Sequence, residues 1–340
     1  MSASLATLYA ELLEQALVHE RLTPLDGQLP GGVVAKTVRG RRYLYWQVRK
    51  GDRVFQHYLG PDSDDLRQQL DRLNGERADA TQRSATLDRL AAMLVRGGAV
   101  GEDARVGGIL RLLADLGVFR RGGVLIGTQA FRCYGNLLAV RLPSTAQRTL
   151  DIDVAHSVDI ALSAAFEPAA SVESGLGQIG LLAVPGLDPR QPSTSFHVRG
   201  REVRVDFVTP ARRGARSLPV AIPGLGVSAW PLPGLDYLIE DPTPAVVLGT
   251  SAVLVRVPRP GRFALHKLWT ATNRPVSEQA KAGKDRAQAV AIIRVLETDR
   301  PDDLVEAREA LASRPSMRRR ILAELERCTR AAGDQSRPGS

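Results

Sequence analysis

The stretch TLDIDV at residues 149–154 decides how this sequence is expected to fold. Side chains alternate between the two faces of a strand, so Asp151 and Asp153 should point one way and Ile152 the other. The stretch RVDFV at residues 204–208 places one acid, Asp206, between apolar neighbours. Three carboxylates on neighbouring strands repel one another unless a cation lies between them, and hard divalent cations prefer oxygen ligands. The pattern therefore predicts a metal site formed by Asp151, Asp153 and Asp206.

A second informative stretch, VLIGT at residues 124–128, precedes these acids. It predicts a strand that ends at Gly127 and Thr128 and opens a helix over residues 129–138. A glycine at this turn lets the backbone approach a phosphate, and a helix N-terminus offers free N–H groups and a positive dipole end. Thr128 adds a hydroxyl. Triphosphate and metal would then lie side by side, as nucleotidyl transfer requires.

These motifs have competing readings. The run LDIDV at residues 150–154 also suits an exposed edge strand whose acids are simply solvated. The run GLGQIG at residues 175–180 matches a dinucleotide-binding fingerprint by spelling, but it lacks a preceding strand and a following helix, so that reading is rejected. Walker A, His-Glu-x-x-His and Gly-x-Ser-x-Gly motifs are absent from the sequence.

Taken in order, the motifs resemble those of DNA polymerase beta-like nucleotidyltransferases. They are most similar to an uncharacterised bacterial family with this fold, whose members run Gly-Thr-x-Ala-Phe, Thr-x-Asp-Ile-Asp and Val-Asp-(two hydrophobic residues)-Thr-Pro. This chain has GTQAF at 127–131, TLDID at 149–153 and VDFVTP at 205–210. The resemblance covers about residues 100–300. Many superfamily members have Gly-Ser where this chain has Gly127-Thr128, and threonine keeps the hydroxyl.

The resemblance implies a two-metal enzyme. Asp151 and Asp153 would ligate both Mg²⁺ (or Mn²⁺) ions, and Asp206 would ligate one and help to activate the attacking hydroxyl. The reaction would be in-line attack on the α-phosphate of an NTP with loss of pyrophosphate.

Nucleotidyltransferases of the abortive-infection type, including toxins, carry Lys and Lys-Asp pairs on helices near the active site. By this similarity Lys267 and Lys284 would contact phosphates, and Asp285 would orient Lys284 or a nucleotide. From the residues alone, the lysines are equally well explained as solvated, and Asp285 as the N-cap of the helix that follows it. His156 and His266 are candidate neighbours of the active site by position.

The N-terminal region predicts a three-stranded meander over 33–38, 42–48 and 53–59. Residues 33–59 contain seven basic side chains against Asp52 alone, and five of the sixteen aromatics of the chain. Basic residues hold phosphate backbones and aromatic faces stack bases, so this region is a candidate nucleic-acid grip. The alternative is a small core made by Tyr43, Tyr45 and the valines, with exposed arginines.

The expected architecture is α/β (α+β). The mixed-sheet nucleotidyltransferase core would span residues 99–262, after an N-terminal region over 1–98 with a helix, the meander and a helical linker. A C-terminal helical domain would span residues 263–330 and a disordered tail 331–340. The two cysteines, Cys133 and Cys328, are expected to be reduced, and no signal peptide or membrane span is evident, so the expected location is cytoplasmic.

The formal charge of +9 favours a polyanionic partner. The predicted function is Mg²⁺-dependent transfer of an NMP from an NTP to a hydroxyl, with RNA or tRNA as acceptor slightly ahead of protein or a small molecule. A toxin-like role would bring a cognate antitoxin as partner. The alternatives are a catalytically inactive nucleic-acid-binding protein with this fold and a scaffold without chemistry.

Overall fold

The computed structural model describes residues 1–23, 31–50, 53–143, 150–157, 171–186, 188, 191–200, 202–212, 214 and 218–335. The chain divides into two compact units: a smaller unit of residues 14–89 and a larger unit of residues 1–13 and 90–340. Each unit has its own sheet. The sequence also predicts a helix near residues 158–166 and loops at 24–32 and 143–148. That helix and most of both loops lie outside the described residues.

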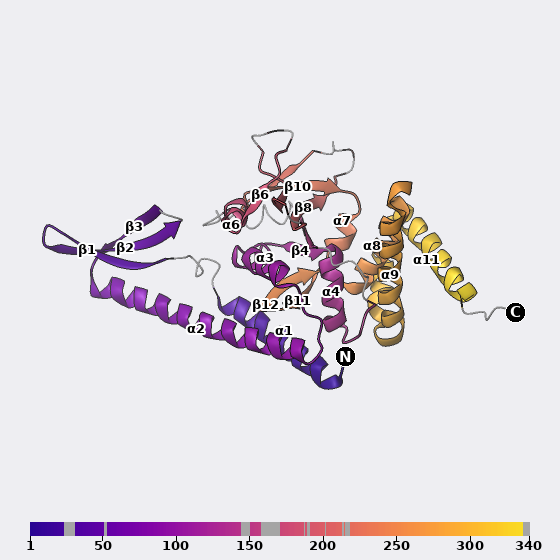
Figure 1. The fold of residues 1–340 in the computed structure, drawn as a ribbon, viewed down its shortest axis with the longest axis horizontal. Helices are drawn as coiled ribbons and strands as arrows, with labels where there is room; N and C mark the ends of the chain where they lie inside the picture. The colour runs from indigo at the N-terminus through magenta and orange to yellow at the C-terminus, as the bar shows by residue number, and fades with distance from the viewer. Residues whose placement is uncertain are drawn as a thin grey trace. The chain divides into compact units, whose positions relative to one another are not determined.

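A mixed sheet forms the centre of the larger unit (Figure 1). Its path runs through β4 (Gly123–Ile126), β5 (Asp151–His156), β8 (Arg204–Pro210), β10 (Val227–Leu232) and β9 (Val220–Ile222). The central strands β5, β8 and β10 are parallel, whereas β4 and β9 are antiparallel to their neighbours. A branch of β6 (Leu181–Ala183) and β7 (Ser195–Val198) joins β8 through β7. This mixed sheet with covering helices confirms the predicted fold class.

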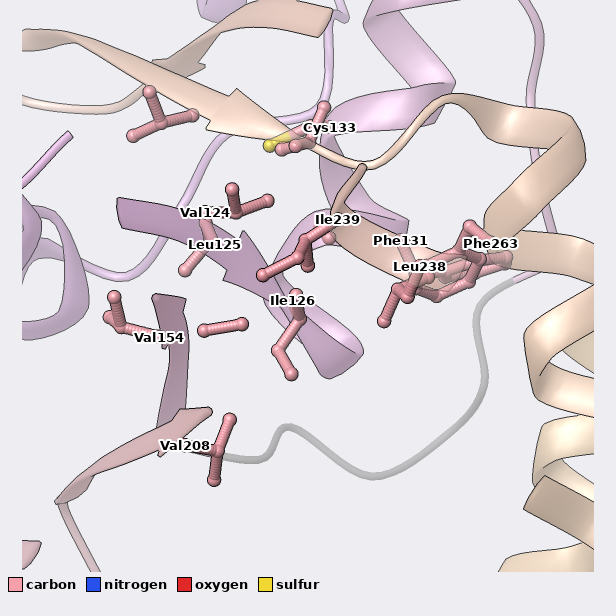
Figure 2. Close-up of a cluster of buried hydrophobic side chains, with 14 of the residues drawn as sticks. Val124, Leu125, Ile126, Phe131, Cys133, Val154, Val208, Leu238, Ile239 and Phe263 are labelled. Carbon is pink, nitrogen blue, oxygen red and sulfur yellow. The ribbon is translucent and has the colours of Figure 1, made fainter. Parts of the chain in front are cut away.

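The alternation of side chains along β5 and β8 separates the core from the candidate site. Ile152, Val205 and Phe207 are at most 1% exposed, so the apolar positions of both strands point into the core. β4 is buried on both faces and continues that core. Figure 2 shows part of it, with Val124, Val154 and other apolar side chains packed together. The acids between these positions are left on the opposite face.

Helices and a ribbon complete the larger unit. They are α3 (Ala104–Asp115), α4 (Gly127–Leu137), α6 (Val172–Gln178), α7 (Leu235–Ile239), β11 (Thr243–Leu248), β12 (Ala252–Val257), α8 (Pro260–Asn273), the 3-10 turn η2 (Val276–Glu278), α9 (Gln279–Asp299), α10 (Pro301–Glu309) and α11 (Pro315–Gln335). One apolar cluster runs from α3 to α11. Phe263 of α8 packs on Phe131 and Tyr134 of α4, with ring centroids 6.4 and 5.0 Å apart. The C-terminal helices thus share the core of the sheet, whereas residues 263–330 were expected to form a domain of their own.

The smaller unit holds the predicted meander. Its strands are β1 (Gly32–Val38), β2 (Arg41–Lys50) and β3 (Arg53–Pro61), all antiparallel. Ser63 caps the following helix by accepting a hydrogen bond from the Leu66 N–H at 3.3 Å. The sequence predicts one helix up to about residue 74 and another over 76–96, but the structure has a single helix, α2 (Asp64–Arg96), which runs through Gly75 without a break. One glycine in 33 helical residues costs only about 1 kcal/mol, so it does not end the helix.

Further expectations can be compared with the structure. The first helix was expected at residues 4–19, and α1 (Ala3–Leu22) is somewhat longer. The last helix, α11, continues to Gln335, past the expected start of the tail at residue 331. Cys133 and Cys328 are both free. Of the helices described, none is long and apolar enough to cross a bilayer.

Candidate active site

The three aspartates lie side by side on two neighbouring strands. β5 and β8 are parallel, and their register places Asp153 directly beside Asp206 and Asp151 beside Arg204. Asp151 is exposed at the start of β5, while Asp153 and Asp206 are half-buried. The sequence prediction of a shared face is confirmed, and the long segment between the two strands does not separate the acids.

Burial and mutual repulsion act on the two acids of β5. Burial, then the nearby Asp206 and Asp151 carboxylates, raise the pKa of Asp153 to about 6. The pKa of Asp151 is raised by the same kinds of cause, burial first and Asp206 second. Among the residues that the structure describes, neither carboxylate has an ion-pair partner. Two acids held in this way favour a cation between them.

The turn between β4 and α4 brings backbone N–H groups next to Asp153. Gly127 has a φ of +67°, a conformation that favours glycine, and a Cβ at this position would collide with Oδ2 of Asp153. The free N–H groups of α4 therefore begin beside the carboxylates. Lys284 of α9 reaches the same turn and donates to Oγ1 of Thr128 at 3.3 Å. Lys284, which was expected to contact phosphates, therefore lies at the turn that the sequence assigns to the triphosphate.

Asp285 lies inside α9 and is 2% exposed, so the alternative that it caps this helix is wrong. Its carboxylate accepts from Nζ of Lys267 at 2.7 Å and from Nε of Arg274 at 2.6 Å. Arg274 also donates to Glu278 at 2.7 Å. Asp285 therefore positions Lys267 and Arg274 rather than Lys284.

A cleft of about 410 Å³ connects these groups. Its lining includes Gly127 and Asp153, the cations Lys267 and Arg274, and a set of apolar and aromatic side chains. The apolar and aromatic members are Ile126, Val208, Leu232, Pro233, Leu235, Leu238, Phe263, Trp269 and Pro275. Sequence reasoning missed Trp269, because a single tryptophan in a helix is as typical of a core as of a ligand site. The cleft joins a charged lining to an apolar one, as a nucleotide requires.

The region of the chain that builds this site matches a family model described as Nucleotidyltransferase, over residues 104–312. The match covers more than half of the chain. The chain belongs to the nucleotidyltransferase family. No curated protein and no solved structure matches it. The three aspartates, the Gly127 turn and the cations of α8 and α9 all lie inside the matched region, so this nucleotidyltransferase carries its candidate site within the family core.

The three aspartates of this nucleotidyltransferase differ in how well they could bind a divalent metal. Asp151 and Asp153 present oxygen ligands of the kind that Mg²⁺ prefers, with no competing cation paired to them in the described part of the chain. Asp206 instead accepts from Nε of Arg204 at 2.8 Å, and the same nitrogen lies 3.0 Å from Oγ of Ser195. Within the described residues no three His, Cys, Asp or Glu side chains are gathered tightly enough to hold a metal. The β5 pair fits a metal, whereas Oδ1 of Asp206 is engaged by Arg204, which would leave Oδ2 as its available ligand.

The two candidate histidines of this nucleotidyltransferase have different surroundings. His156 is buried, and its ring nitrogens lie 2.9 and 2.8 Å from the carbonyl oxygens of Ser157 and Arg121, which is a structural role. His266 lines the cleft, 5.4 Å from the ring of Trp269. Its Nε2 is buried without a hydrogen-bond partner in the described structure, and burial lowers its pKa to about 3. His266 is therefore a neutral ring beside Trp269.

Proposed function

We propose that this nucleotidyltransferase moves a nucleoside monophosphate from an NTP to a hydroxyl group of an acceptor. The observation that carries the proposal is the position of Asp151 and Asp153, two carboxylates without ion-pair partners in the described residues, next to the Gly127 turn. Carboxylates repel a phosphate, whereas the N–H groups at the turn attract it. A cation between the carboxylates and the phosphate would allow both kinds of group to lie at one site.

The triphosphate would lie at the N-terminus of α4. There the free N–H groups and the positive end of the helix dipole favour an anion. Lys284 brings a positive charge to the hydroxyl of Thr128, and Lys267 and Arg274 line the cleft that includes Gly127 and Asp153. These three cations come from α8, α9 and the connection between them, so helices that already contact α4 would supply the positive charge for the triphosphate.

Asp151 and Asp153 would hold Mg²⁺ or Mn²⁺. A divalent ion bound there supplies charge neutralisation for the triphosphate and the departing pyrophosphate. Asp206 lies beside Asp153 and would present Oδ2, while its Oδ1 accepts from Arg204; release of that contact would free the whole carboxylate for the acceptor hydroxyl.

The chemical step forms one bond and breaks one. The acceptor oxygen bonds to the α-phosphorus, the bond from this phosphorus to the bridging oxygen breaks, and pyrophosphate leaves with the electron pair. The proton of the hydroxyl passes to the carboxylate of Asp206, which lies beside Asp153 in the register of the sheet.

The apolar part of the cleft would hold the base. Trp269 supplies a large aromatic face, and its ring is fixed on one side because it packs against the backbone of Gly234. A Cβ at Gly234 would lie within 2.7 Å of that ring. A planar base would stack on an indole held in this manner. For the acceptor, the charge of +9 favours RNA over a protein or a small molecule.

A transfer assay tests this function. The full chain is incubated with each α-³²P-labelled NTP, Mg²⁺ and total RNA or cell lysate, beside Asp151→Asn/Asp153→Asn. The double variant is expected to lose at least about 100-fold in rate, because the metal contributes several kcal/mol of charge stabilisation. Asp299→Asn, an exposed acid at the end of α9, is the matched control and should retain activity. Label that appears equally with both variants would reject the assignment.

One observation favours a second candidate, a nucleotidyltransferase fold that binds nucleic acid without chemistry. The ion pair between Arg204 and Asp206 occupies the third acid, as a site without metal would require. This candidate predicts that no NTP transfers label in the assay above, and that nucleic-acid binding persists in Asp151→Asn/Asp153→Asn and in EDTA.

A further inference from the structure

The aromatic residues of the smaller unit are divided between the two faces of its sheet. In the register of β1, β2 and β3, Tyr43 and Tyr45 share one face with Tyr58, whereas Leu44 and Trp46 point the other way. Leu44 is 6% exposed, and the guanidinium of Arg77 from α2 lies 4.4 Å from the Trp46 ring. The face with Trp46 is therefore the one that α2 covers.

The opposite face carries a cluster of three tyrosines. The ring of Tyr58 lies 6.0 Å from that of Tyr43 and 5.5 Å from that of Tyr45, at steep interplanar angles. Tyr58 is 57% exposed, whereas a ring in a core would be buried. Tyr43 and Tyr45 are half-buried beneath Tyr58, and Val38, which the alternative counted in a small core, is exposed, so this face is open to solvent at Tyr58 and not closed into a core. We call Tyr43, Tyr45 and Tyr58 the tyrosine face.

Positive charge surrounds the tyrosine face. The ammonium of Lys36 lies 5.3 Å from the centre of the Tyr45 ring. Arg39 and Arg41 flank the turn between β1 and β2, and neither has an acidic partner among the described residues. The one acid in the described part of residues 31–62 is Asp62, and it is occupied by Arg42 and Arg67 at 3.2 and 2.6 Å. The face thus offers aromatic rings and uncompensated cations together.

We infer that the tyrosine face binds single-stranded nucleic acid. Exposed rings stack unpaired bases, and nearby cations attract the phosphates between them. A duplex is a poorer match, since its bases already stack on one another and present only their edges to a protein. The inference goes beyond the proposed transfer reaction, because it concerns a separate unit of the chain and needs neither NTP nor metal.

Fluorescence anisotropy tests the inference. The full chain is titrated into fluorescein-labelled 15-nucleotide RNA, DNA of the same sequence, and the corresponding duplexes, in EDTA and at two salt concentrations. Both single strands should bind more tightly than the duplexes, and a preference for RNA over DNA would indicate contacts to the 2′-hydroxyl. Tyr58→Ala should weaken single-strand binding about 5-fold or more, and Tyr45→Ala/Tyr58→Ala further. Lys36→Gln/Arg41→Gln should lower the dependence on salt.

Two control variants make the result decisive. Tyr58→Phe keeps the ring and should bind like the unaltered protein, which separates stacking from a loss of folding. Phe55→Ala removes another exposed aromatic, 44% exposed, from the face that the register gives to Trp46, and should leave affinity unchanged. The inference is overturned if the unaltered protein binds no single strand, if duplexes bind more tightly, or if Phe55→Ala weakens binding as much as Tyr58→Ala. Because the titration contains EDTA and no NTP, a failed transfer assay does not affect it.

Discussion

At the residue scale, the candidate active site contains positions at which a single added atom or proton would be unfavourable. Gly127 is required because its backbone turns at a positive φ and because a single added carbon would strike the carboxylate of Asp153. The carboxylate of Asp153 therefore lies against the Gly127 turn, where only glycine leaves room for it. His266 is a second such position, since its ring lies in the cleft as a neutral group with a buried nitrogen.

The neutral state of His266 predicts how stability changes with pH. In the unfolded chain this histidine gains a proton near pH 6.5, but in the folded protein only near pH 3. Between these values the unfolded chain binds the extra proton, so the free energy of unfolding falls as the pH drops below about 6.5. At pH 5 the loss due to this residue should be about 2 kcal/mol.

Urea unfolding at pH 7.5 and pH 5 measures this effect. The decrease in unfolding free energy should be smaller in His266→Gln than in the unaltered protein, by about the amount given above. Equal decreases in the two proteins would show that His266 takes up its proton equally well in both states.

At the element scale, Asp285 joins α8 to α9 from inside the second helix. It holds one cation of α8, Lys267, and one from the connection, Arg274. Both cations line the cleft, so the packing of two helices sets the positions of two phosphate-binding candidates. Removal of the Asp285 charge is costly, because it leaves Lys267 without its acidic partner and Arg274 with Glu278 alone.

Asp285→Asn is therefore expected to destabilise the protein by about 3–5 kcal/mol. Glu278→Gln, which removes the more exposed partner of Arg274, should cost less than about 1 kcal/mol. Lys267→Met/Asp285→Leu should recover much of the stability and still bind NTP poorly. Chemical denaturation and nucleotide titration measure the two properties separately, and a double variant with normal NTP binding would contradict the role given to Lys267.

At the scale of the whole molecule, residues at the start of the chain belong to the larger unit. Tyr9 is 3% exposed, and its hydroxyl donates to the carbonyl of Val246 at 3.2 Å and accepts from the N–H of the same residue at 3.0 Å. Residues 1–13 therefore belong to the larger unit and are bonded to β11 through Tyr9. The residues that follow them, 14–89, form the other unit.

Tyr9→Phe should lower the free energy of unfolding by about 1–3 kcal/mol, because it leaves a buried N–H and a buried C=O without their partner. Tyr58→Phe removes the hydroxyl of an exposed tyrosine and should change stability by less than about 0.5 kcal/mol. Thermal unfolding of the two variants beside the unaltered chain provides the comparison. Equal stability of all three proteins would show that the Tyr9 hydroxyl adds nothing to the larger unit.

The sequence by itself determined the N-terminal meander, the strands that carry the three motifs and the shared face of Asp151 and Asp153, because these follow from local periodicity and from the order of the motifs. It also determined the Gly127 turn. It did not predict β9 or β10, which lie in a stretch rich in glycine and proline. Three features were decided by the tertiary structure and could not be predicted from local sequence patterns. Asp285 is a buried ion-pair partner and not a cap, Trp269 lines the cleft, and Asp206 is paired with Arg204. Each of these depends on side chains brought together from distant elements, and packing, not spacing along the chain, chooses the partner.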